Sequence, residues 1–373
     1  MTFETAFTMD TSSIKYGPGV TREVGHDMKD MGTRRVMVVT DPNMTKSQSV
    51  SVTLEALRNQ GIDAVLFDRV SVEPTDVSFM EAIRFAKDGK FDGYVAVGGG
   101  SSSVAIFDFL EMHAKTGIAH RALRPVMGIV DPDNTHTLPR MVAACTGLDV
   151  LSHALESLTA LPFHRRPAPE SPKMRPAYQG ANPISSIWAS RAIEMIARNL
   201  VRAIENPSDE EARGQMLLAA SFAGIGFGNA GVHLPHGMSY PVSGMVREYV
   251  PEGYPAGHPI VPHGMAVALH APAVFRFTAP ANPELHLYAA GLMGADTSGV
   301  QPGSAGELLA GTIADVMRRV GMPNGLAAIG FGPADVDKLV AGTLPQHRVT
   351  KLSPRPVDAD VLKQLFLDSM TCW

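Results

Sequence analysis

Strands and helices alternate along the first hundred residues, and this pattern limits the possible folds more than any other feature of the chain. Three short apolar runs, 35–40, 64–67 and 94–97, contain β-branched residues and are typical of buried parallel strands. Helical patterns at 52–59 and 76–87 separate them. Alternation at this spacing predicts βαβ units, and we therefore expect an α/β domain with a doubly wound parallel sheet.

The alternation stops after the third expected strand. The segment Gly98-Gly99-Gly100-Ser101 is followed almost at once by another strand-like run at 104–107, with no helix between them. A parallel neighbour requires a crossover of about a dozen residues or more. We therefore expect that the chain either turns back here as a hairpin or lacks its next βα unit.

Two features of this half are candidates for binding a nucleotide. Asp41 follows the first expected strand, where a carboxylate can accept hydrogen bonds from a ribose diol; a helix cap or turn residue is the equal alternative. Gly98, Gly99, Gly100 and Ser101 follow the third strand, where backbone N–H groups can approach a pyrophosphate without interference from Cβ atoms. A plain tight turn is the alternative for these glycines, and the missing helix weakens the phosphate interpretation.

From about Arg140 onward the pattern becomes helical. We therefore expect a shortened nucleotide-binding α/β domain at 1–139 and an all-α domain at 140–373. The expected helices are 142–159, 187–204, 210–223, 263–277, 305–320 and 360–370. A proline-rich, polar stretch at 162–183 interrupts them, and loops of that length inside a domain are usually functional or mobile.

The helical domain carries one carboxylate and three histidines in a pattern that suits a metal ion. Asp149 and His153 are four residues apart on an expected helix and project from one face. His236 and His263 each follow a proline and begin the tripeptide His-Gly-Met. Such a set suits Fe²⁺ or Zn²⁺ with positions left for a substrate. The alternative for Asp149 and His153 is a chance surface pair, since the chain has 13 histidines.

Composition excludes several classes of protein. The chain has 373 residues and a net charge of −5, so a basic nucleic-acid-binding face is not expected. Its two cysteines provide neither a disulfide framework nor a cysteine-rich zinc module. No apolar run approaches the roughly 20 residues of a membrane span, and residues 1–12 lack the pattern of a signal peptide. We expect a cytoplasmic enzyme, or a mature mitochondrial form as the alternative, with no nucleic-acid or membrane partner.

These motifs together resemble the iron-containing, or group III, alcohol dehydrogenases, and within that family the hydroxyacid-oxoacid transhydrogenase branch. The segments that carry the resemblance to the family are 16–19, 40–41, 98–101, 147–156 and the two His-Gly-Met tripeptides. The segments that carry the resemblance to the branch are 73–83, 175–185, 222–234 and 343–352.

The resemblance implies a nucleotide-binding α/β domain followed by a helical metal-binding domain, in a dehydroquinate synthase-like arrangement. It implies Fe²⁺, or Zn²⁺ in its place, held by Asp149, His153, His236 and His263, with NAD as the second cofactor. The implied reaction moves a hydride from 4-hydroxybutyrate to 2-oxoglutarate through NAD. The resemblance also implies a homodimer that takes small hydroxyacid and oxoacid substrates.

The chain departs from the family pattern in two places. The family continues its Gly-Gly-Gly-Ser with an Asp-containing helix and a Thr-Thr-x-Gly-Thr-Gly-Ser-Glu loop over the cofactor, and neither follows Ser101 here. Many members carry a histidine four residues after the third metal ligand. This chain has Tyr240 there, which is the candidate catalytic residue and leaves the proton relay unassigned.

The missing segment leaves two alternatives to a transhydrogenase. One is an ordinary NAD-dependent iron-containing alcohol dehydrogenase, and the other is an inactive shortened relative that acts as a binding protein. For a transhydrogenase, both implied substrates carry a carboxylate, so a cation is expected in the cleft. The candidates, each with a solvated surface position as its alternative, are Arg165, Arg166, Lys173, Arg175, Arg348 and Lys351.

Overall fold

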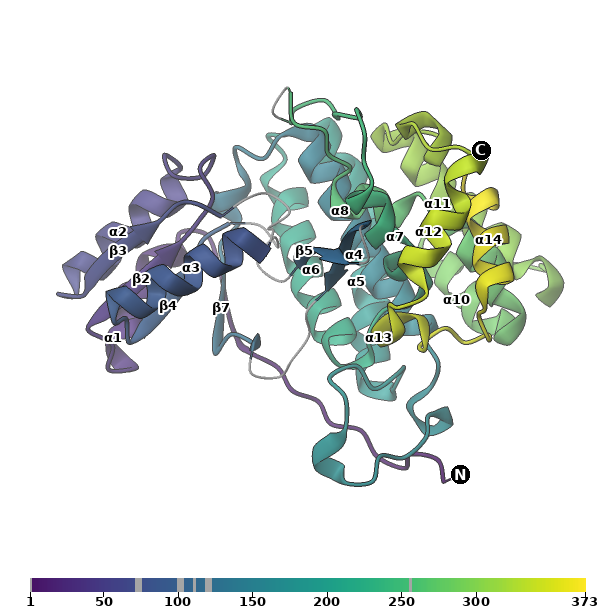
Figure 1. Ribbon diagram of the computed structural model, residues 1–373, viewed down its shortest axis with the longest axis horizontal. Helices are drawn as coiled ribbons and strands as arrows, with labels where there is room; N and C mark the ends of the chain where they lie inside the picture. The colour runs from purple at the N-terminus through teal and green to yellow at the C-terminus, as the bar shows by residue number, and fades with distance from the viewer. Residues whose placement is uncertain (1, 71–75, 99–103, 110–111, 118–122, 255–256) are drawn as a thin grey trace. The chain divides into compact units, whose positions relative to one another are not determined.

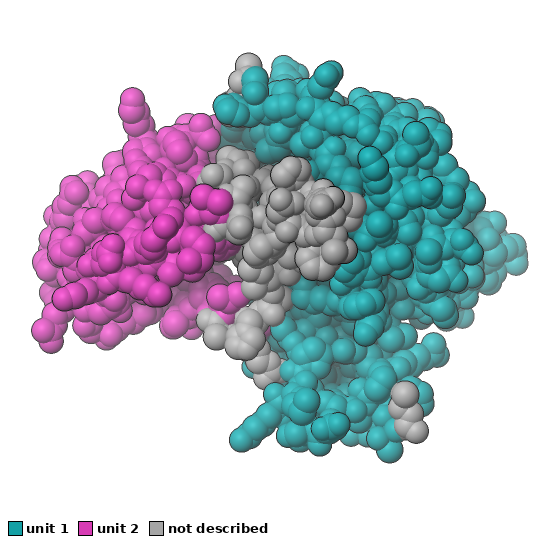
Figure 2. Space-filling model, in the orientation of Figure 1, with its two compact units in different colours: residues 1–11, 138–373 teal, residues 12–137 magenta. Residues whose placement is uncertain are grey.

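The chain folds into two compact units, one α/β and one helical. The computed structural model describes residues 2–70, 76–98, 104–109, 112–117, 123–254 and 257–373. The helical unit comprises residues 1–11 and 138–373, and the α/β unit comprises residues 12–137 (Figure 2). The division after residue 137 lies close to the boundary expected at 139. Residues 1–11, however, group with the helical unit, which the sequence pattern did not indicate.

A three-stranded parallel sheet forms the α/β unit, in the order β3-β2-β4 (Figure 1). The strands are β2 (Arg35–Val39), β3 (Asp63–Phe67) and β4 (Gly93–Ala96). The connecting helices are α2 (Gln48–Asn59) and α3 (Asp76–Gly89). The strand–helix alternation predicted from the sequence is therefore confirmed. Crossover helices of this kind are what allow neighbouring strands to run parallel.

Helix α2 begins at Gln48, four residues earlier than the predicted start at residue 52. The side chain of Ser47 accepts a hydrogen bond from the backbone N–H of Val50 at 3.3 Å and caps the helix there. The buried residue Leu57 of α2 packs with Val36 and Val38 of β2 in the core of this unit. Three further elements flank the sheet: helix α1 (Val24–Asp30) and the parallel pair β1 (Ser13–Tyr16) and β7 (Met127–Val130).

The break in the alternation is a hairpin. Strand β5 (Val104–Phe109) pairs antiparallel with β6 (Met112–Gly117), in a register that sets Val104 opposite Gly117 and Phe109 opposite Met112. This is one of the two outcomes that the spacing predicted. The candidate cofactor residues Gly99, Gly100 and Ser101 lie outside the described residues, whereas Gly98 lies within them.

The helical unit is built around α4, which packs against α5, α6 and α8. Its buried residues Leu148, Leu151 and Leu155 belong to the main hydrophobic core. The helices of this unit are α4 (Arg140–Thr159), α5 (Pro183–Glu205), α6 (Glu210–Ala230), α7 (Leu234–Gly244), α8 (His263–Ala268), α9 (Ala271–Thr278), α10 (Pro283–Leu292), α11 (Ala305–Val320), α12 (Val336–Thr343), α13 (His347–Thr350) and α14 (Ala359–Asp368).

Three predicted helices of this unit were wrong in extent, and the one expected at 187–204 begins four residues earlier, at Pro183. The single helix expected at 263–277 is divided into α8 and α9, because Pro272 has no backbone N–H and is accommodated in the first turn of a new helix. The helix expected at 210–223 continues to Ala230 through a glycine-rich stretch. A Cβ at Gly226 would come within 3.2 Å of the carbonyl oxygen of Ser185, so the small residue allows α6 to pack closely against α5.

The N-terminal segment is attached to the proline-rich stretch and to α6. Residue Phe3 forms a β-bridge with Pro167, and the N–H of Glu4 donates to the carbonyl of Arg166 at 2.9 Å. Three contacts complete the attachment: Glu4 pairs with Arg175, and the backbone N–H groups of Thr8 and Asp10 donate to the side-chain oxygens of Gln179 and Asn229. The stretch expected to be functional or mobile is therefore held in place by residues from the other end of the sequence.

In the part of the chain that the structure describes, no single helix has the length and apolar composition to cross a membrane. The helices α6 and α7 meet that requirement only as a pair, with a bend of 102° between them.

Candidate metal centre

Helix α4 presents three functional side chains along one face. Asp149 and His153 are one turn apart, and Glu156 follows three residues after His153, so all three project in the same direction. The two remaining candidates lie at the starts of other helices, His236 in the first turn of α7 and His263 as the first residue of α8. The structure therefore brings all four predicted ligands to one place in the helical unit.

The ligand atoms lie close together. One atom each from Asp149, His236 and His263 falls within a group whose members are all within 4.8 Å of one another. The Nε2 atoms of His153 and His236 are 3.0 Å apart, which places the fourth predicted ligand beside this group. The Oδ1 atom of Asp149 is 3.5 Å from the Nε2 atom of His236, beyond the usual distance for a strong hydrogen bond.

Glu156 is a residue of this centre that the sequence analysis did not identify. Its carboxylate is fully buried, and its Oε1 atom is 2.6 Å from Nδ1 of His236. Its Oε2 atom accepts a hydrogen bond from the backbone N–H of His233 at 2.7 Å. A proton that Glu156 holds on Nδ1 of His236 would leave Nε2 as the ring atom available to a metal ion in place of its own proton. The available signal was its position on the same helical face as Asp149 and His153.

The glycine after each metal-candidate histidine permits close packing, as the sequence predicted. A Cβ at Gly264 would lie 2.0 Å from the carbonyl oxygen of Cys145 and 2.8 Å from Cβ of Asp149, so α8 can approach α4 only with glycine there. A Cβ at Gly237 would lie 3.1 Å from Thr350 and 3.3 Å from Val349, a tighter fit than ordinary contact. Gly264 therefore fixes the distance between His263 and Asp149.

The charges of the centre favour a cation. Burial would lower the pKa of His236, but the neighbouring Glu156 and Asp149 carboxylates raise it to about 9. Burial lowers the pKa of His153 to about 4, so this ring is neutral at pH 7. Burial opposes ionisation of Asp149, yet the imidazoles of His153 and His263 hold its pKa below the usual range. The two ionised carboxylates, Asp149 and Glu156, lie among imidazoles of which His153 is neutral at pH 7. They leave a negative electrostatic potential in this buried centre.

This donor set fits a divalent transition metal. One carboxylate oxygen and three imidazole nitrogens are hard-to-borderline ligands, which suit Fe²⁺ and Zn²⁺. The carboxylate that holds Nδ1 of His236 is the outer-shell partner that metal-bound histidines ordinarily have. The positive charge of a metal ion would also compensate the two carboxylates, Asp149 and Glu156.

Aromatic rings and one guanidinium surround the histidines. The ring of Phe227 stacks on that of His153, with centroids 4.0 Å apart. The ring of Tyr240 is parallel to that of His263, with centroids 6.0 Å apart, and its hydroxyl accepts a hydrogen bond from Arg348 at 2.7 Å. Burial raises the pKa of Tyr240 to about 12. A proton carrier works best with a pKa near the working pH, and the pKa of Tyr240 lies well above that range. A catalytic role for Tyr240 therefore stays a prediction.

Two of the candidate nucleotide residues, Asp41 and Gly98, lie at the carboxyl edge of the parallel sheet. Asp41 follows β2, and its Oδ1 atom accepts a hydrogen bond from the backbone N–H of Asn43 at 2.8 Å, which is the turn role considered above. Gly98 follows β4 with a φ of 148°, and a Cβ there would lie 4.0 Å from Oδ2 of Asp41. The two positions are therefore neighbours at the edge where open α/β sheets bind ligands.

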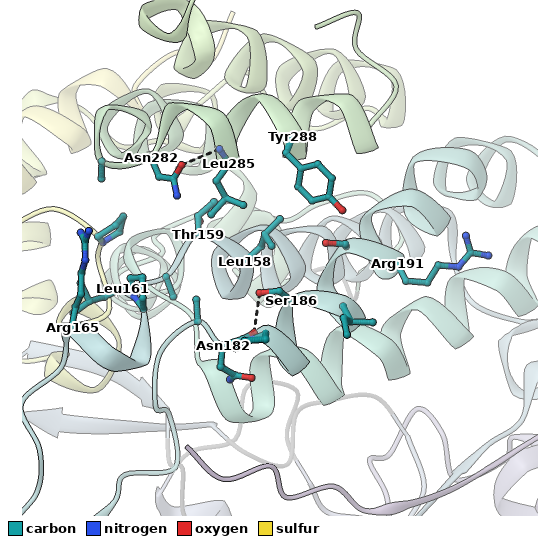
Figure 3. Close-up of a pocket in the computed structure, with 18 of the residues that line it drawn as sticks. Leu158, Thr159, Leu161, Arg165, Asn182, Ser186, Arg191, Asn282, Leu285 and Tyr288 are labelled. Atoms are coloured by element: carbon teal, nitrogen blue, oxygen red, sulfur yellow. Dashed lines mark hydrogen bonds between the residues drawn. The ribbon is translucent and has the colours of Figure 1, made fainter. Parts of the chain in front are cut away.

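A separate cavity of about 710 Å³ lies in the helical unit, between the ends of α4, α5 and α10 (Figure 3). Arg165, Asn182, Arg191 and Tyr288 contribute to its lining. In Figure 3, Arg165 and Arg191 lie at opposite ends of the view. Among the predicted metal and cofactor residues within the described ranges, none lines this cavity. It is therefore distinct from the centre formed by Asp149 and the histidines.

Two family models match the chain. The model described as iron-containing alcohol dehydrogenase matches residues 11–106. The model described as Fe-containing alcohol dehydrogenase family, C-terminal, matches residues 177–370. The first match ends a few residues after Ser101, where the sequence departs from the family pattern.

Curated relatives match almost the whole chain. The mitochondrial hydroxyacid-oxoacid transhydrogenase of Bos taurus is 47% identical, in an alignment that covers 99% of this chain and 91% of the relative. The human protein of that name is 46% identical with the same coverage. The probable mitochondrial hydroxyacid-oxoacid transhydrogenase of Dictyostelium discoideum is 44% identical, covering 99% of this chain and 80% of the relative.

The names of these relatives correct one expectation. The predicted cytoplasmic location is contradicted, because the relatives are named as mitochondrial proteins. Residues 1–12 were a weak basis for that prediction, since a mature mitochondrial chain need not display a targeting pattern. The cattle and human alignments extend over 423 positions, at least 50 more than the length of this chain, so these relatives carry residues without a counterpart here.

Solved structures confirm the predicted fold class of an α/β domain joined to a helical domain. A 1,3-propanediol oxidoreductase superimposes with a TM-score of 0.84 at 24% identity, covering 98% of this chain and 100% of that one. A sulfoacetaldehyde reductase from Bifidobacterium kashiwanohense, solved in complex with NAD⁺, gives a TM-score of 0.76 at 20% identity, covering 98% of each chain. These structures support the fold, and the family models and curated relatives support the lineage: the chain belongs to the iron-containing alcohol dehydrogenase family of oxidoreductases.

Proposed function

We propose that this protein is a metal-dependent hydroxyacid-oxoacid transhydrogenase. It moves a hydride from C4 of 4-hydroxybutyrate to C2 of 2-oxoglutarate through bound NAD. The donor loses a hydride and its hydroxyl proton to become succinic semialdehyde, and the acceptor gains both to become 2-hydroxyglutarate. The observation that carries the proposal is the cluster of Asp149, His236 and His263, backed by Glu156, in a chain 47% identical to a relative of that name.

Membership of the family implies a metal ion and a nicotinamide cofactor. We propose Fe²⁺, with Zn²⁺ as the alternative, held by Asp149, His153, His236 and His263. When bound, the metal supplies Lewis-acid polarisation of the substrate oxygen. The protein provides the orientation: Glu156 fixes the ring of His236, and Phe227 packs flat against the ring of His153.

The nicotinamide cofactor is assigned to the carboxyl edge of the sheet. We propose that NAD lies there, with Asp41 toward the ribose and Gly98, Gly99, Gly100 and Ser101 near the pyrophosphate. Support comes from the adjacent positions of Asp41 and Gly98 at the ends of parallel strands. A carboxylate at Asp41 would accept hydrogen bonds from a ribose diol and repel the 2′-phosphate of NADP.

Isotope transfer tests the proposed reaction directly. Full-length protein is loaded with Fe²⁺ under anaerobic conditions and given catalytic NAD, 2-oxoglutarate, and 4-hydroxybutyrate with two deuterium atoms on C4. Mass spectrometry should find deuterium in 2-hydroxyglutarate, in an amount that matches the succinic semialdehyde formed. Products that appear without the label in 2-hydroxyglutarate would exclude hydride transfer between the two substrates.

The same preparation discriminates the two alternatives. An ordinary alcohol dehydrogenase would accumulate NADH from butan-1-ol and excess NAD, with no oxoacid present, at least as efficiently as from 4-hydroxybutyrate. The family models, which are named for alcohol dehydrogenases, support this alternative as well, whereas the curated relatives at 44–47% identity carry the transhydrogenase name. An inactive relative would retain metal but neither bind NADH, followed by nicotinamide fluorescence, nor form either product.

A further inference from the structure

We propose that Arg348 binds the substrate carboxylate, and that it thereby selects hydroxyacids and oxoacids over neutral alcohols and ketones. This assignment rests on the proposed function, because it names the residue that binds the carboxylate common to both proposed substrates. It is argued from the surroundings of the six cationic side chains that the sequence offered as candidates.

Five of those six cations are committed elsewhere or lie on the surface. Arg175 forms an ion pair with Glu4 at 2.8 Å, and Arg166 donates to the backbone carbonyl of Tyr178. Three other side chains lie exposed, namely Arg165, Lys173 and Lys351. Arg165 in addition lines the separate cavity of Figure 3, away from the metal candidates.

Arg348 differs from these because it is partly buried between two tyrosines. Its Nη2 atom donates to the hydroxyl of Tyr240 at 2.7 Å, and its guanidinium carbon lies over the ring of Tyr178, 5.1 Å from the centroid. The short helix α13 that carries it is anchored by Val349, which is fully buried, against Gly237. Gly237 directly follows the metal candidate His236, so the side chains of Val349 and Thr350, which flank or nearly flank Arg348, pack beside the residue next to His236.

Two chains of aromatic contacts connect Arg348 with the metal candidates. On one side, Tyr240 contacts Arg348 and is parallel to the ring of His263. On the other side, Tyr178 lies 6.4 Å from Phe227, which stacks on His153. The guanidinium thus lies one or two side chains from two different metal candidates, with aromatic surface on either side.

Within the part of the chain that the structure describes, the charge of Arg348 is not neutralised by an acid. Among the described residues, no carboxylate lies within ion-pair distance of this guanidinium, whereas the partly buried Lys15 and Arg175 each have one. It donates a hydrogen bond to the neutral hydroxyl of Tyr240, and a guanidinium has five N–H donors. A guanidinium of this kind is suited to bind a carboxylate through two parallel hydrogen bonds.

Matched alcohols test the assignment. Metal-loaded, full-length protein is compared with the R348M and R348K variants, using 4-hydroxybutyrate and butan-1-ol, which have the same chain length and differ by the carboxylate. Reduction of NAD is followed by fluorescence. Loss of a buried charged partner should lower kcat/KM for 4-hydroxybutyrate by about 30- to 1,000-fold in R348M. The loss for butan-1-ol should be at least about tenfold smaller than the loss for 4-hydroxybutyrate, and R348K should fall between wild type and R348M.

A binding measurement separates this proposal from the proposed function. Succinate, an inert dicarboxylate, is titrated into each protein by calorimetry, and R348M should bind it at least about 30-fold more weakly than wild type. The K351M variant, which removes an exposed cation three residues away, should bind succinate like wild type. If neither alcohol reduces NAD in wild type, the proposed function fails, and the succinate titration still decides the role of Arg348.

Three outcomes would overturn the assignment. An equal loss of activity with both alcohols would show that Arg348 only supports the structure. The assignment also fails if wild type does not bind succinate. It fails as well if R348M and R348K bind succinate as wild type does, because the carboxylate would then be bound elsewhere. Circular dichroism and metal content identify a misfolded R348M, in which case R348K, with its retained length and charge but no planar fork, provides the comparison.

Discussion

The metal centre and the carboxyl edge of the sheet are both candidate binding sites, but they are built from different kinds of contact. At the centre, a fully buried carboxylate of Glu156 holds the ring of His236, and a backbone N–H holds Glu156 in turn. At the edge, Asp41 is only partly buried and binds the backbone of its own turn, while Gly98 contributes no side chain. The centre is thus specified by side chains, and the edge mainly by the path of the backbone.

From this difference we can infer which substitutions each site tolerates. In a buried network, loss of one partner leaves another group unsatisfied and costs more than the contact itself contributes. At a partly exposed edge, water replaces a lost hydrogen bond at little cost. Single substitutions should therefore have large effects on metal binding and smaller effects on nucleotide binding.

Removal of a metal ligand should have the largest effect. In H263A, bound metal measured by atomic absorption should fall from about one per chain to near zero after dialysis, because the variant loses one of four proposed ligands. The D41N variant, changed only at the sheet edge, should retain wild-type stoichiometry. Unchanged metal content in folded H263A would exclude His263 as a ligand.

Substitution of Glu156 tests whether the outer partner matters as much as the contacts indicate. E156Q should weaken metal affinity by about 10- to 100-fold, because the amide no longer favours a proton on Nδ1 of His236. Competition with a metal-binding dye measures the affinity. The exposed Glu307 provides the matched control, since E307Q should bind metal like wild type. Equal affinities for E156Q and wild type would reduce Glu156 to a packing role.

The two glycines of the His-Gly-Met tripeptides should differ in their sensitivity. G264A should lower the free energy of unfolding by about 3 kcal/mol and weaken metal binding, because its Cβ meets rigid backbone of α4. G237A should cost only about 1 kcal/mol, because its Cβ meets methyl groups that can shift. Urea denaturation of the metal-free proteins gives both values. A larger cost for G237A would reverse this interpretation of the packing.

Two variants of Asp41 should separate its turn role from its nucleotide role. D41N keeps an oxygen that accepts the N–H of Asn43 but loses the charge, whereas D41A loses both. The ratio of NAD to NADP affinity should fall by about tenfold in both variants if the carboxylate faces the ribose. The free energy of unfolding should fall by about 1 kcal/mol in D41A alone. A ratio that stays at the wild-type value in D41N would leave Asp41 a turn residue only.

The ion pair between Glu4 and Arg175 should give the smallest effect, and one that depends on pH. The hydrogen bond from Arg175 lowers the pKa of Glu4 from 4.5 to about 2. The carboxylate therefore stabilises the folded state fully above pH 4.5, and this contribution is lost as the pH falls toward 2. The Tm of E4Q should lie about 1 °C below that of wild type at pH 7. The gap should narrow at pH 3; a constant gap would show that the charge of Glu4 contributes nothing.

Local patterns in the sequence were sufficient for the strands and helices that surround the two sites. Periodicity predicted the parallel strands, and the missing spacer after Gly98 predicted a hairpin as one outcome. The division of the helix expected at 263–277 was also visible in principle, because Pro272 marks the first turn of α9. The extension of α6 through its glycines was not, since it depends on close packing against α5.

Distant contacts account for what the sequence did not indicate. In the sequence, Glu156 is only one more residue of a helix. Its role depends on its contact with His236, 80 positions further along the chain. The grouping of residues 1–11 with the helical unit likewise depends on partners such as Gln179, 171 positions away from Thr8. No local periodicity encodes such pairs, because they arise only when separate helices pack.

In terms of chain topology, the attachment of residues 1–11 makes the α/β unit an insertion within the helical one. The hydrogen bond between Asp10 and Asn229 spans 219 positions, so it forms only after Asn229 has been synthesised. Residues 12–137 can complete their own core before that point, since domains generally fold as units during synthesis. Residues 1–11 are then synthesised before the α/β unit but reach their final positions after it, and closure of the helical unit around them becomes a late, slow step set by a very long loop.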